Sequence, residues 1–516
     1  MWRAAVCVLL LLCMNTQVTG AADKAEGTGI TLAPPSFSGK LLVIPMDGSH
    51  WVAIKALAQA MGRRGHKVTV VIPEVNIRMG PGKHYDTVTF PVPYDKASLN
   101  IIGTNKHLME KSSESFIQDM RKRFAHMQRI ADFLHTTAES LLFNATLISH
   151  LAEQGFDAVL TDPMVPTGTL MARKLGLPSI NLLRGIPCLM DMKAAGCPSP
   201  PSYVPRFFTG FTDKMNFMER TINTLIALVE PLMCRVLYKH FDHIAYQFLG
   251  EEVGIAELLS DSAIWLQSLD FSRTSSLPSA QGGRDSWVSG EHGFVVFTLG
   301  SMVSDMPVKR ASVFLEAFRQ IPQKVIWRYT GQIPDSVPDN VRIMEWVPQN
   351  DLLAHPGARA FITHGGSHGL FEGLCHAVPM VMVPLTADQP DNAQKMASKG
   401  VGVVLDIMSI TTEGLLQGLN AIINDTRYKE RVQKLSAVHK DRPIDPLQLS
   451  VYWTEFVMRH KGAQHLRAAV LELNWIQYFC LDVIALLATV LLVFVILTVK
   501  CFKVCLRKLG RKRKQE

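Results

Sequence analysis

The sequence is poor in cysteine, and its cysteines are not spaced as metal ligands. Nine occur in 516 residues, and no Cys-x-x-Cys motif is present. The fold therefore does not depend on a framework of disulfides, and a zinc site of the usual spacing is excluded. Internal repeats and long low-complexity segments are also lacking, so the chain is not a repeat array.

A distributed excess of one charge is lacking too. The formal net charge is +8, but residues 500–516 contain eight lysines and arginines against one glutamate. The rest of the chain is therefore close to neutral, which argues against a basic nucleic-acid-binding face. Hydrophobic residues make up 47% of the 516 residues, and this length is enough for two domains of ordinary size.

The N-terminus has the features of a cleavable secretory signal, which we expect over residues 1–21. Arg3 is followed by an apolar run from 4 to 13 and by small residues at 20–22. This order of a basic, an apolar and a small-residue region is typical of signal peptides. The mature chain is therefore expected to enter the secretory pathway.

A membrane-spanning helix is predicted near the C-terminus, over residues 478–499. Residues 483–499 carry no charge, and Trp475 and Tyr478 precede them as interfacial aromatics do. A buried core helix has a similar composition, but it would not be followed by the cations of residues 500–516. The positive-inside rule places this tail in the cytosol and the upstream chain on the other side.

The last residues match a dilysine retrieval pattern, with Lys514 and Lys512 third and fifth from the end. In a type I protein this pattern indicates the endoplasmic reticulum; the alternative is that these lysines only extend the basic flank. Sequons at Asn144 and Asn424 predict glycosylation in that lumen. The pairing of the lumenal cysteines is left open: Cys188, Cys197, Cys234 and Cys375.

The N-terminal half opens with a βαβ unit, predicted as strand 40–45, helix 52–64 and strand 67–72. His50 lies in the first turn of this unit. A later buried strand ends at Asp162, before Pro163. The carboxyl ends of parallel strands meet at one edge of a sheet, so His50 and Asp162 are expected at the same edge. Each residue also has a simpler interpretation, as a helix cap or a turn residue.

A second α/β region follows a Ser-, Gly- and Pro-rich linker at about residues 270–291. The predicted elements are strand 293–299, helix 307–320, strand 324–329, and helices 427–440 and 446–461. We expect the last helix to cross back over the first domain. Residues 100–150 are expected to form helices.

Residues 346–389 form the most informative stretch, WVPQNDLLAHPGARAFITHGGSHGLFEGLCHAVPMVMVPLTADQ. The expected order is strand 360–363, loop 364–369, helix 370–376 and strand 378–385. A glycine-rich turn before a helix N-terminus suits an anion, because free N–H groups and the helix dipole point at it. The glycines alone are equally compatible with an ordinary turn that binds nothing.

This stretch as a whole resembles the UDP-glycosyltransferase signature. The form Ser367-His368-Gly369 is similar to the vertebrate UDP-glucuronosyltransferases. Plant relatives carry Trp-Asn-Ser at these three positions, so the plant phosphate contacts cannot be transferred to them. The resemblance extends from about Lys40 through the membrane span. It implies an α/β fold of the GT-B class, with two doubly wound Rossmann-like domains and a C-terminal transmembrane helix.

The resemblance also implies a role for each site residue. His50 would be the catalytic base, oriented by Asp162. The implied donor-binding residues are Trp346 on the uracil; Gln349 beside the base and ribose; His364, with the turn formed by Gly366, His368 and Gly369, and Ser301 in a second turn, on the diphosphate; Glu372 on the ribose; and Asp388 and Gln389 on the sugar. Taken singly, Trp346 could be a core residue and Glu372 a solvated helix residue.

The implied organisation is a signal peptide (1–21), an acceptor-binding domain (22–285), a UDP-sugar-binding domain (286–470), the transmembrane helix (478–499) and a basic cytosolic tail (500–516). The implied reaction is inverting transfer of glucuronic acid from UDP-glucuronate to a small lipophilic acceptor, as in the conjugation of xenobiotics or steroids. UDP-glucuronate would be a co-substrate, and no metal or other cofactor is expected.

Two alternatives remain at this stage. One is a glucosyl- or other hexosyltransferase with the same residues, since no motif identifies the partner of the donor carboxylate. The other is a non-catalytic UDP-sugar-binding regulatory subunit, which the presence of His50 and Asp162 disfavours. The acceptor and the homo- or hetero-oligomeric state are left open.

Overall fold

The computed structural model describes residues 37–103, 109, 116–183, 190–206, 209–267, 291–300, 303, 305–334, 336–386 and 388–512. The predicted signal peptide, Ser301, Cys188 and most of the predicted linker lie outside these residues. The limits predicted for the domains therefore stay predictions.

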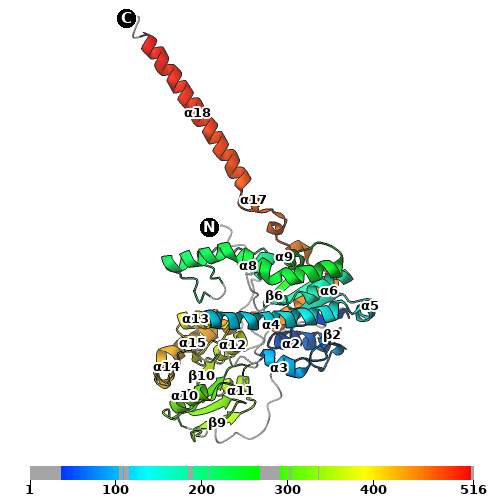
Figure 1. Cartoon of the computed structure of the whole chain (residues 1–516), viewed down its shortest axis with the longest axis vertical. Helices are drawn as coiled ribbons and strands as arrows, with labels where there is room; N and C mark the ends of the chain where they lie inside the picture. The colour runs from blue at the N-terminus through cyan, green and yellow to red at the C-terminus, as the bar shows by residue number, and fades with distance from the viewer. Residues whose placement is uncertain are drawn as a thin grey trace, which may run out of the picture. The chain divides into compact units, whose positions relative to one another are not determined.

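The first domain contains a parallel sheet with the strand order β3-β2-β1-β4-β5-β6. Figure 1 labels β2 and β6 of this sheet. Its strands are β1 (Lys40–Ile44), β2 (Lys67–Pro73), β3 (Asp86–Phe90), β4 (Ala158–Thr161), β5 (Ser179–Leu183) and β6 (Ile264–Gln267). The helices of this part are α2 (His50–Arg63), α3 (Lys96–Gly103), α4 (Phe116–Leu142), α5 (Ala145–Glu153), α6 (Thr167–Leu175), α7 (Met190–Ala194), α8 (Phe217–Leu249) and α9 (Ile255–Ser260). The expected helices between residues 100 and 150 are confirmed by α4 and α5.

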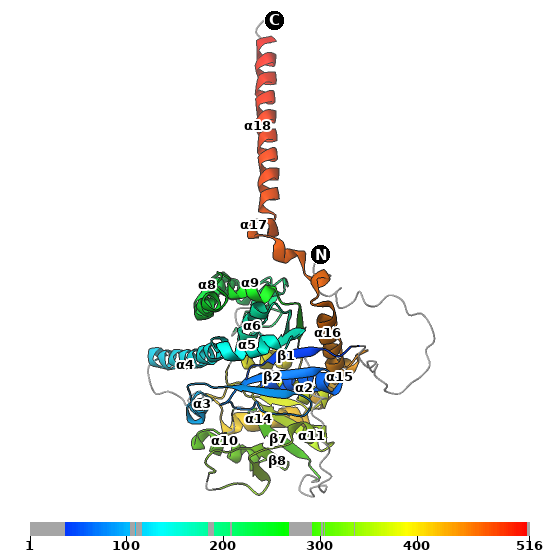
Figure 2. The same ribbon diagram turned by 90° about the vertical axis from the view of Figure 1, so that its right-hand side faces the viewer.

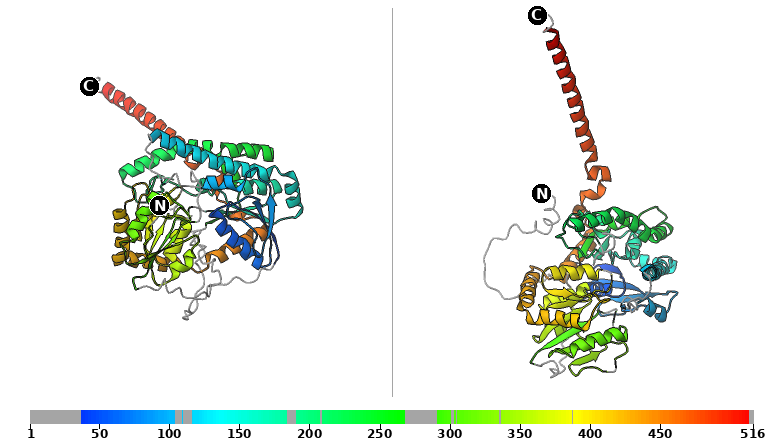
Figure 3. Two further views of the ribbon diagram at one scale, coloured as in Figure 1. Left: turned by 60° about the horizontal axis from the view of Figure 1, so that its bottom comes forward. Right: turned by 60° about the vertical axis from the view of Figure 1, so that its left-hand side comes forward.

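The second domain repeats this plan with the strand order β9-β8-β7-β10-β11-β12. Its strands are β7 (Phe294–Thr298), β8 (Lys324–Arg328), β9 (Val341–Met344), β10 (Ala358–Thr363), β11 (Met380–Met382) and β12 (Gly402–Val404). The helices are α10 (Val308–Phe318), α11 (Gln349–Ala354), α12 (Ser367–Cys375), α13 (Gln389–Ser398), α14 (Thr412–Asn424), α15 (Thr426–Lys440) and α16 (Pro446–His460). The blue strands of the first sheet and the green-to-yellow strands of the second belong to separate layered bodies (Figure 3).

Apolar side chains cover both faces of each sheet. In β1, Leu42 and Ile44 pack toward α4, α6 and α8, whereas Leu41 and Val43 pack toward α2. Each of these four side chains is buried. A strand buried on both faces has a continuous run of apolar residues, and this run predicted β1 as a buried strand.

The C-terminal part contains α17 (Trp475–Tyr478) and α18 (Leu481–Lys512), the long red helix of Figure 2. Its residues from Leu481 to Val504 are long and apolar enough to cross a membrane. The helix thus begins three residues after the predicted start at 478. It also continues beyond 499 into the basic tail, where residues 500–512 contain no proline to end it.

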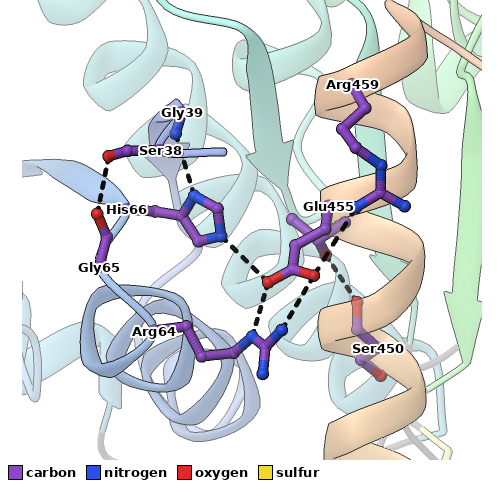
Figure 4. Close-up of polar contacts among 9 residues, drawn as sticks. Ser38, Gly39, Arg64, Gly65, His66, Ser450, Glu455 and Arg459 are labelled. Carbon is purple, nitrogen blue, oxygen red and sulfur yellow. Dashed lines mark hydrogen bonds and ion pairs between the residues drawn. The ribbon is translucent and has the colours of Figure 1, made fainter. Parts of the chain in front are cut away.

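Helix α16 packs on the first domain, as the sequence predicted. Val451, Val457 and Met458 belong to the apolar cluster that covers α2 and one face of the first sheet. Beside them lies the carboxylate of Glu455, which is 4% exposed (Figure 4). It accepts hydrogen bonds from Arg64 Nε at 2.6 Å and from Arg64 Nη2 at 3.2 Å.

His66 completes this contact. Its Nδ1 accepts a hydrogen bond from the backbone N–H of Gly39 at 3.1 Å, so its Nε2 carries the proton that bonds Glu455 Oε1 at 3.0 Å. Burial alone would raise the pKa of Glu455, but hydrogen bonds from Arg64 and His66 and the charge of Arg64 outweigh it and lower that pKa. A depressed carboxyl pKa stabilises the fold above the unfolded-state value and ceases to do so as the pH falls through the folded-state value.

We expect Glu455→Ala to lower the free energy of unfolding by about 3 kcal/mol, since removing one member of a buried ion pair leaves its partners uncompensated. Thermal unfolding of the full-length protein in detergent measures this. The matched control is Glu251→Ala, which removes an ion pair to Arg173 whose two side chains are 46% and 42% exposed. That control is expected to cost less than about 1 kcal/mol.

The difference between wild type and Glu455→Ala should shrink as the pH falls below 4.5, the ordinary pKa of a glutamate. Equal destabilisation by the two variants at neutral pH would contradict the role assigned to Glu455.

Candidate active site

The catalytic pair predicted in the first domain is in direct contact. His50 is the first residue of α2, after β1, and Asp162 directly follows β4. β1 and β4 are neighbours in the sheet, at the point where the strand order reverses. Nδ1 of His50 lies 2.6 Å from Oδ2 of Asp162, and the two side chains are 21% and 3% exposed.

This contact sets the orientation of the imidazole. A carboxylate only accepts hydrogen bonds, so Nδ1 of His50 donates and Nε2 is left to take a proton from a substrate. The second oxygen of Asp162 accepts from the backbone N–H of Met164 at 2.9 Å. The expected proximity of the pair is confirmed, and the catalytic role stays a prediction.

In the second domain, the predicted phosphate loop is partly helical. The sequence placed residues 364–369 in a loop and began the helix at Leu370, but α12 begins at Ser367 after an extended Gly366. Ser367, His368 and Gly369 therefore form the first helical turn. The positive end of the helix dipole lies at this first turn, so the correction favours an anion site at this place.

His364 lies between two glycine turns. A Cβ atom added to Gly300 or to Gly366 would clash with its imidazole ring. Gly300 also has φ of +82°, which only glycine adopts readily. Gly300 follows β7 and His364 follows β10, so these turns meet where the strand order of the second sheet reverses. Ser301, the predicted contact next to Gly300, lies outside the described residues.

Gln349 and Glu372 bond to each other. Thr298 Oγ1 donates to Gln349 Oε1 at 2.6 Å, which turns the amide nitrogen of Gln349 toward Oε2 of Glu372. Gly369 packs nearby, since a Cβ there would lie 3.1 Å from Thr363 Oγ1 and 3.6 Å from Gln349 Nε2. The residues predicted for the ribose and the phosphate turn are therefore neighbours.

Asp388 and Gln389 lie at the start of α13, and not at the end of a strand as predicted. β11 ends at Met382, so the expected strand 378–385 is too long. The Gln389 side-chain oxygen accepts from the N–H groups of Leu385 and Thr386 at 2.8 and 3.1 Å, which closes the turn before α13.

These two residues still lie beside the phosphate turn. Asp388 accepts from the amide of Asn392 at 2.7 Å. A Cβ on Gly365 would lie 3.0 Å from the backbone oxygen of Gln389.

Trp346 is 58% exposed, so it is not a core residue. The sequence did not indicate the arginine beside it. Arg328, at the end of β8, donates to the carbonyl oxygens of Gly300 and Glu345, the latter at 3.2 Å. Its Cζ lies 5.4 Å from the centroid of the Trp346 ring. Arg328 therefore joins the predicted uracil contact to the second phosphate turn.

Loops of the first domain reach this site. Asp391 in α13 accepts a hydrogen bond from the backbone N–H of Gly210 at 2.8 Å. Arg78, after β2, has its Cζ 5.5 Å from the Trp346 ring. No sequence signal indicated either contact, because the partners are far apart in the chain.

Two further predictions concern modification and metals. Asn144 caps α5 by accepting from the N–H of Leu147 at 3.1 Å, and Asn424 is exposed at the end of α14. Their glycosylation stays a prediction.

Within the described ranges, no three His, Cys, Asp or Glu side chains are grouped as metal ligands would be. The expectation of a reaction without a metal or other cofactor also stays a prediction.

Comparison with known proteins agrees with this geometry. Residues 39–516 match the family described as "UDP-glucoronosyl and UDP-glucosyl transferase". The chain is 42% identical to UDP-glucuronosyltransferase 1A1 of Rattus norvegicus over 530 aligned positions, which cover 99% of this chain and 97% of that protein. It is also 42% identical to UDP-glucuronosyltransferase 1A6 of Homo sapiens, over 92% of this chain and 94% of that protein.

The fold is also similar to that of Os79 from O. sativa in complex with UDP. The TM-score is 0.54 at 15% identity, and the match covers 81% of this chain and all of that one. Neighbours of this kind are GT-B glycosyltransferases, and the two doubly wound sheets fit that class. The chain belongs to the family of UDP-glucuronosyl and UDP-glucosyl transferases.

Proposed function

We propose that this protein transfers glucuronic acid from UDP-glucuronate to a hydroxyl group of a small lipophilic acceptor, with inversion at the anomeric carbon. The observation that carries the proposal is the His50–Asp162 pair, a base held by a buried carboxylate at the switch point of the first sheet. Relatives named UDP-glucuronosyltransferases support the choice of donor.

The proposed reaction is a single displacement. His50 Nε2 takes the proton of the acceptor hydroxyl while the acceptor oxygen bonds to the anomeric carbon. The bond from that carbon to the phosphate oxygen breaks, and UDP leaves with the electron pair. Asp162 stabilises the imidazolium that forms.

The second domain would stabilise the leaving group. N–H groups in the first turn of α12, together with His364, suit the negative charge that develops on the diphosphate. Attack from the face opposite to the leaving UDP gives inversion.

A panel of labelled UDP-sugars and phenolic acceptors tests which donor is used. A preference for UDP-glucose would favour a glucosyltransferase, and the absence of any transfer would favour a regulatory subunit.

We further propose that the protein is a type I protein of the endoplasmic reticulum, with both domains lumenal. The apolar span in α18 and the basic residues after it support this orientation.

Replacing the base should stop transfer and leave nucleotide binding intact. We expect His50→Ala to lower kcat by about 10²–10⁴-fold, the usual effect of general-base catalysis. Asp162→Asn should be similarly damaging, because an amide does not stabilise the imidazolium. His150→Ala, at an exposed histidine of α5, is the control. Retention of more than about a tenth of the turnover by His50→Ala would refute the assignment.

Nucleotide and sugar contacts should separate in kinetics. Glu372→Ala removes an acceptor for ribose hydroxyls and should weaken inhibition by free UDP about five- to a hundredfold. Asp388→Ala should raise the donor KM but leave the UDP inhibition constant nearly unchanged. Glu316→Ala, at a side chain of α10 that is 55% exposed, should alter neither constant. If Asp388→Ala weakens inhibition by free UDP as much as Glu372→Ala does, the assignment of Glu372 to the nucleotide and Asp388 to the sugar is wrong.

Protease added to sealed microsomes should remove only the short basic tail. The proposed orientation leaves the cytosolic face without either domain, so an antibody to the first domain should detect a protected body. Detergent should then allow its digestion. Cleavage of the body in intact vesicles would show that the orientation is wrong.

A further inference from the structure

Arg78 is a residue of the first domain that lies against the donor site of the second. Its Cζ lies 5.5 Å from the centroid of the Trp346 ring, and Arg328 lies at 5.4 Å from the same ring. A guanidinium at this distance from an indole makes a favourable cation–π contact. The roles proposed for the His50–Asp162 pair and for the phosphate turns do not account for the position of Arg78.

The loop that carries Arg78 is joined to the turn that carries His50. The Asp47 carboxylate accepts backbone hydrogen bonds from Ile77 at 2.6 Å and from Arg78 at 3.1 Å. It also accepts from Gly48 at 2.6 Å. Asp47 precedes His50 by three residues, so a shift of the Arg78 loop would be transmitted to the turn of the base.

On the other side of the contact, Trp346 is joined to the phosphate turn. Arg328 donates to the carbonyl oxygens of Glu345, next to Trp346, and of Gly300. Burial lowers the pKa of Arg328, and the nearby charge of Arg78 lowers it further. The two guanidinium groups thus lie close to each other beside the same indole ring.

We propose that Arg78 is a positioning residue for the transfer reaction, which couples the turn of His50 to the nucleotide end of the second domain through Trp346. This rests on the proposed function, in which Trp346 contacts the uracil. Arg78 thereby holds the two domains in the relative orientation in which His50 points toward the bound donor. Its effect is expected in turnover more than in affinity for UDP.

A double-mutant cycle on the full-length protein in microsomes tests this coupling. Arg78→Ala should lower kcat about three- to thirtyfold, the range that a cation–π contact supports, with the UDP inhibition constant within about twofold of wild type. Arg78→Lys keeps the charge without the planar guanidinium and should recover part of the loss. Arg63→Ala, at an exposed arginine of α2, is the matched control.

In the Trp346→Ala background, Arg78→Ala should cost less than about twofold in kcat, because its partner is already absent. Equal losses in both backgrounds would overturn the proposal, as would wild-type kcat in Arg78→Ala. Arg78→Lys supplies the same comparison if the alanine variant is unstable. The contact of Trp346 with the nucleotide is tested separately. Trp346→Ala should weaken inhibition by UDP, and an unchanged UDP inhibition constant would refute that contact and the coupling that depends on it.

Discussion

The reversal of strand order in each sheet is the constraint on which the site depends. Helices that leave two adjacent parallel strands toward opposite faces open a gap at the carboxyl ends of those strands. The first sheet has this point between β1 and β4, and the second between β7 and β10. His50 and Asp162 lie at one such point, and Gly300 and His364 at the other. Each sheet thus carries one half of the predicted site.

Much of this arrangement could be predicted because its signals are local. A short apolar run followed by glycine or a polar residue predicts a buried strand and its functional turn, which identified β1, β4, β7 and β10. His50 and Asp162 are 112 positions apart, yet both follow a strand, and parallel strands bring such residues to one edge. Their adjacency then required only that β1 and β4 be neighbours.

The remainder depends on contacts that sequence patterns do not encode. An arginine at the end of a strand, such as Arg328, is usually solvated, and its position here follows from carbonyl groups contributed by two other segments. The start of α12 was misplaced because glycines favour a loop, whereas Gly366 serves as the cap of the helix. Asp388 was assigned to a strand end because β11 and the chain after it form one apolar run.

Helix α16 has a consequence for the order in which the protein is made. Along the chain, the second domain lies between the first domain and α16, and α16 completes the apolar core of the first domain. Arg64 and His66 leave the ribosome some 390 residues before Glu455, their partner. Domains commonly fold one by one from the N-terminus during synthesis. The core of the first domain is therefore completed on one face only after the second domain and α16 have been translated.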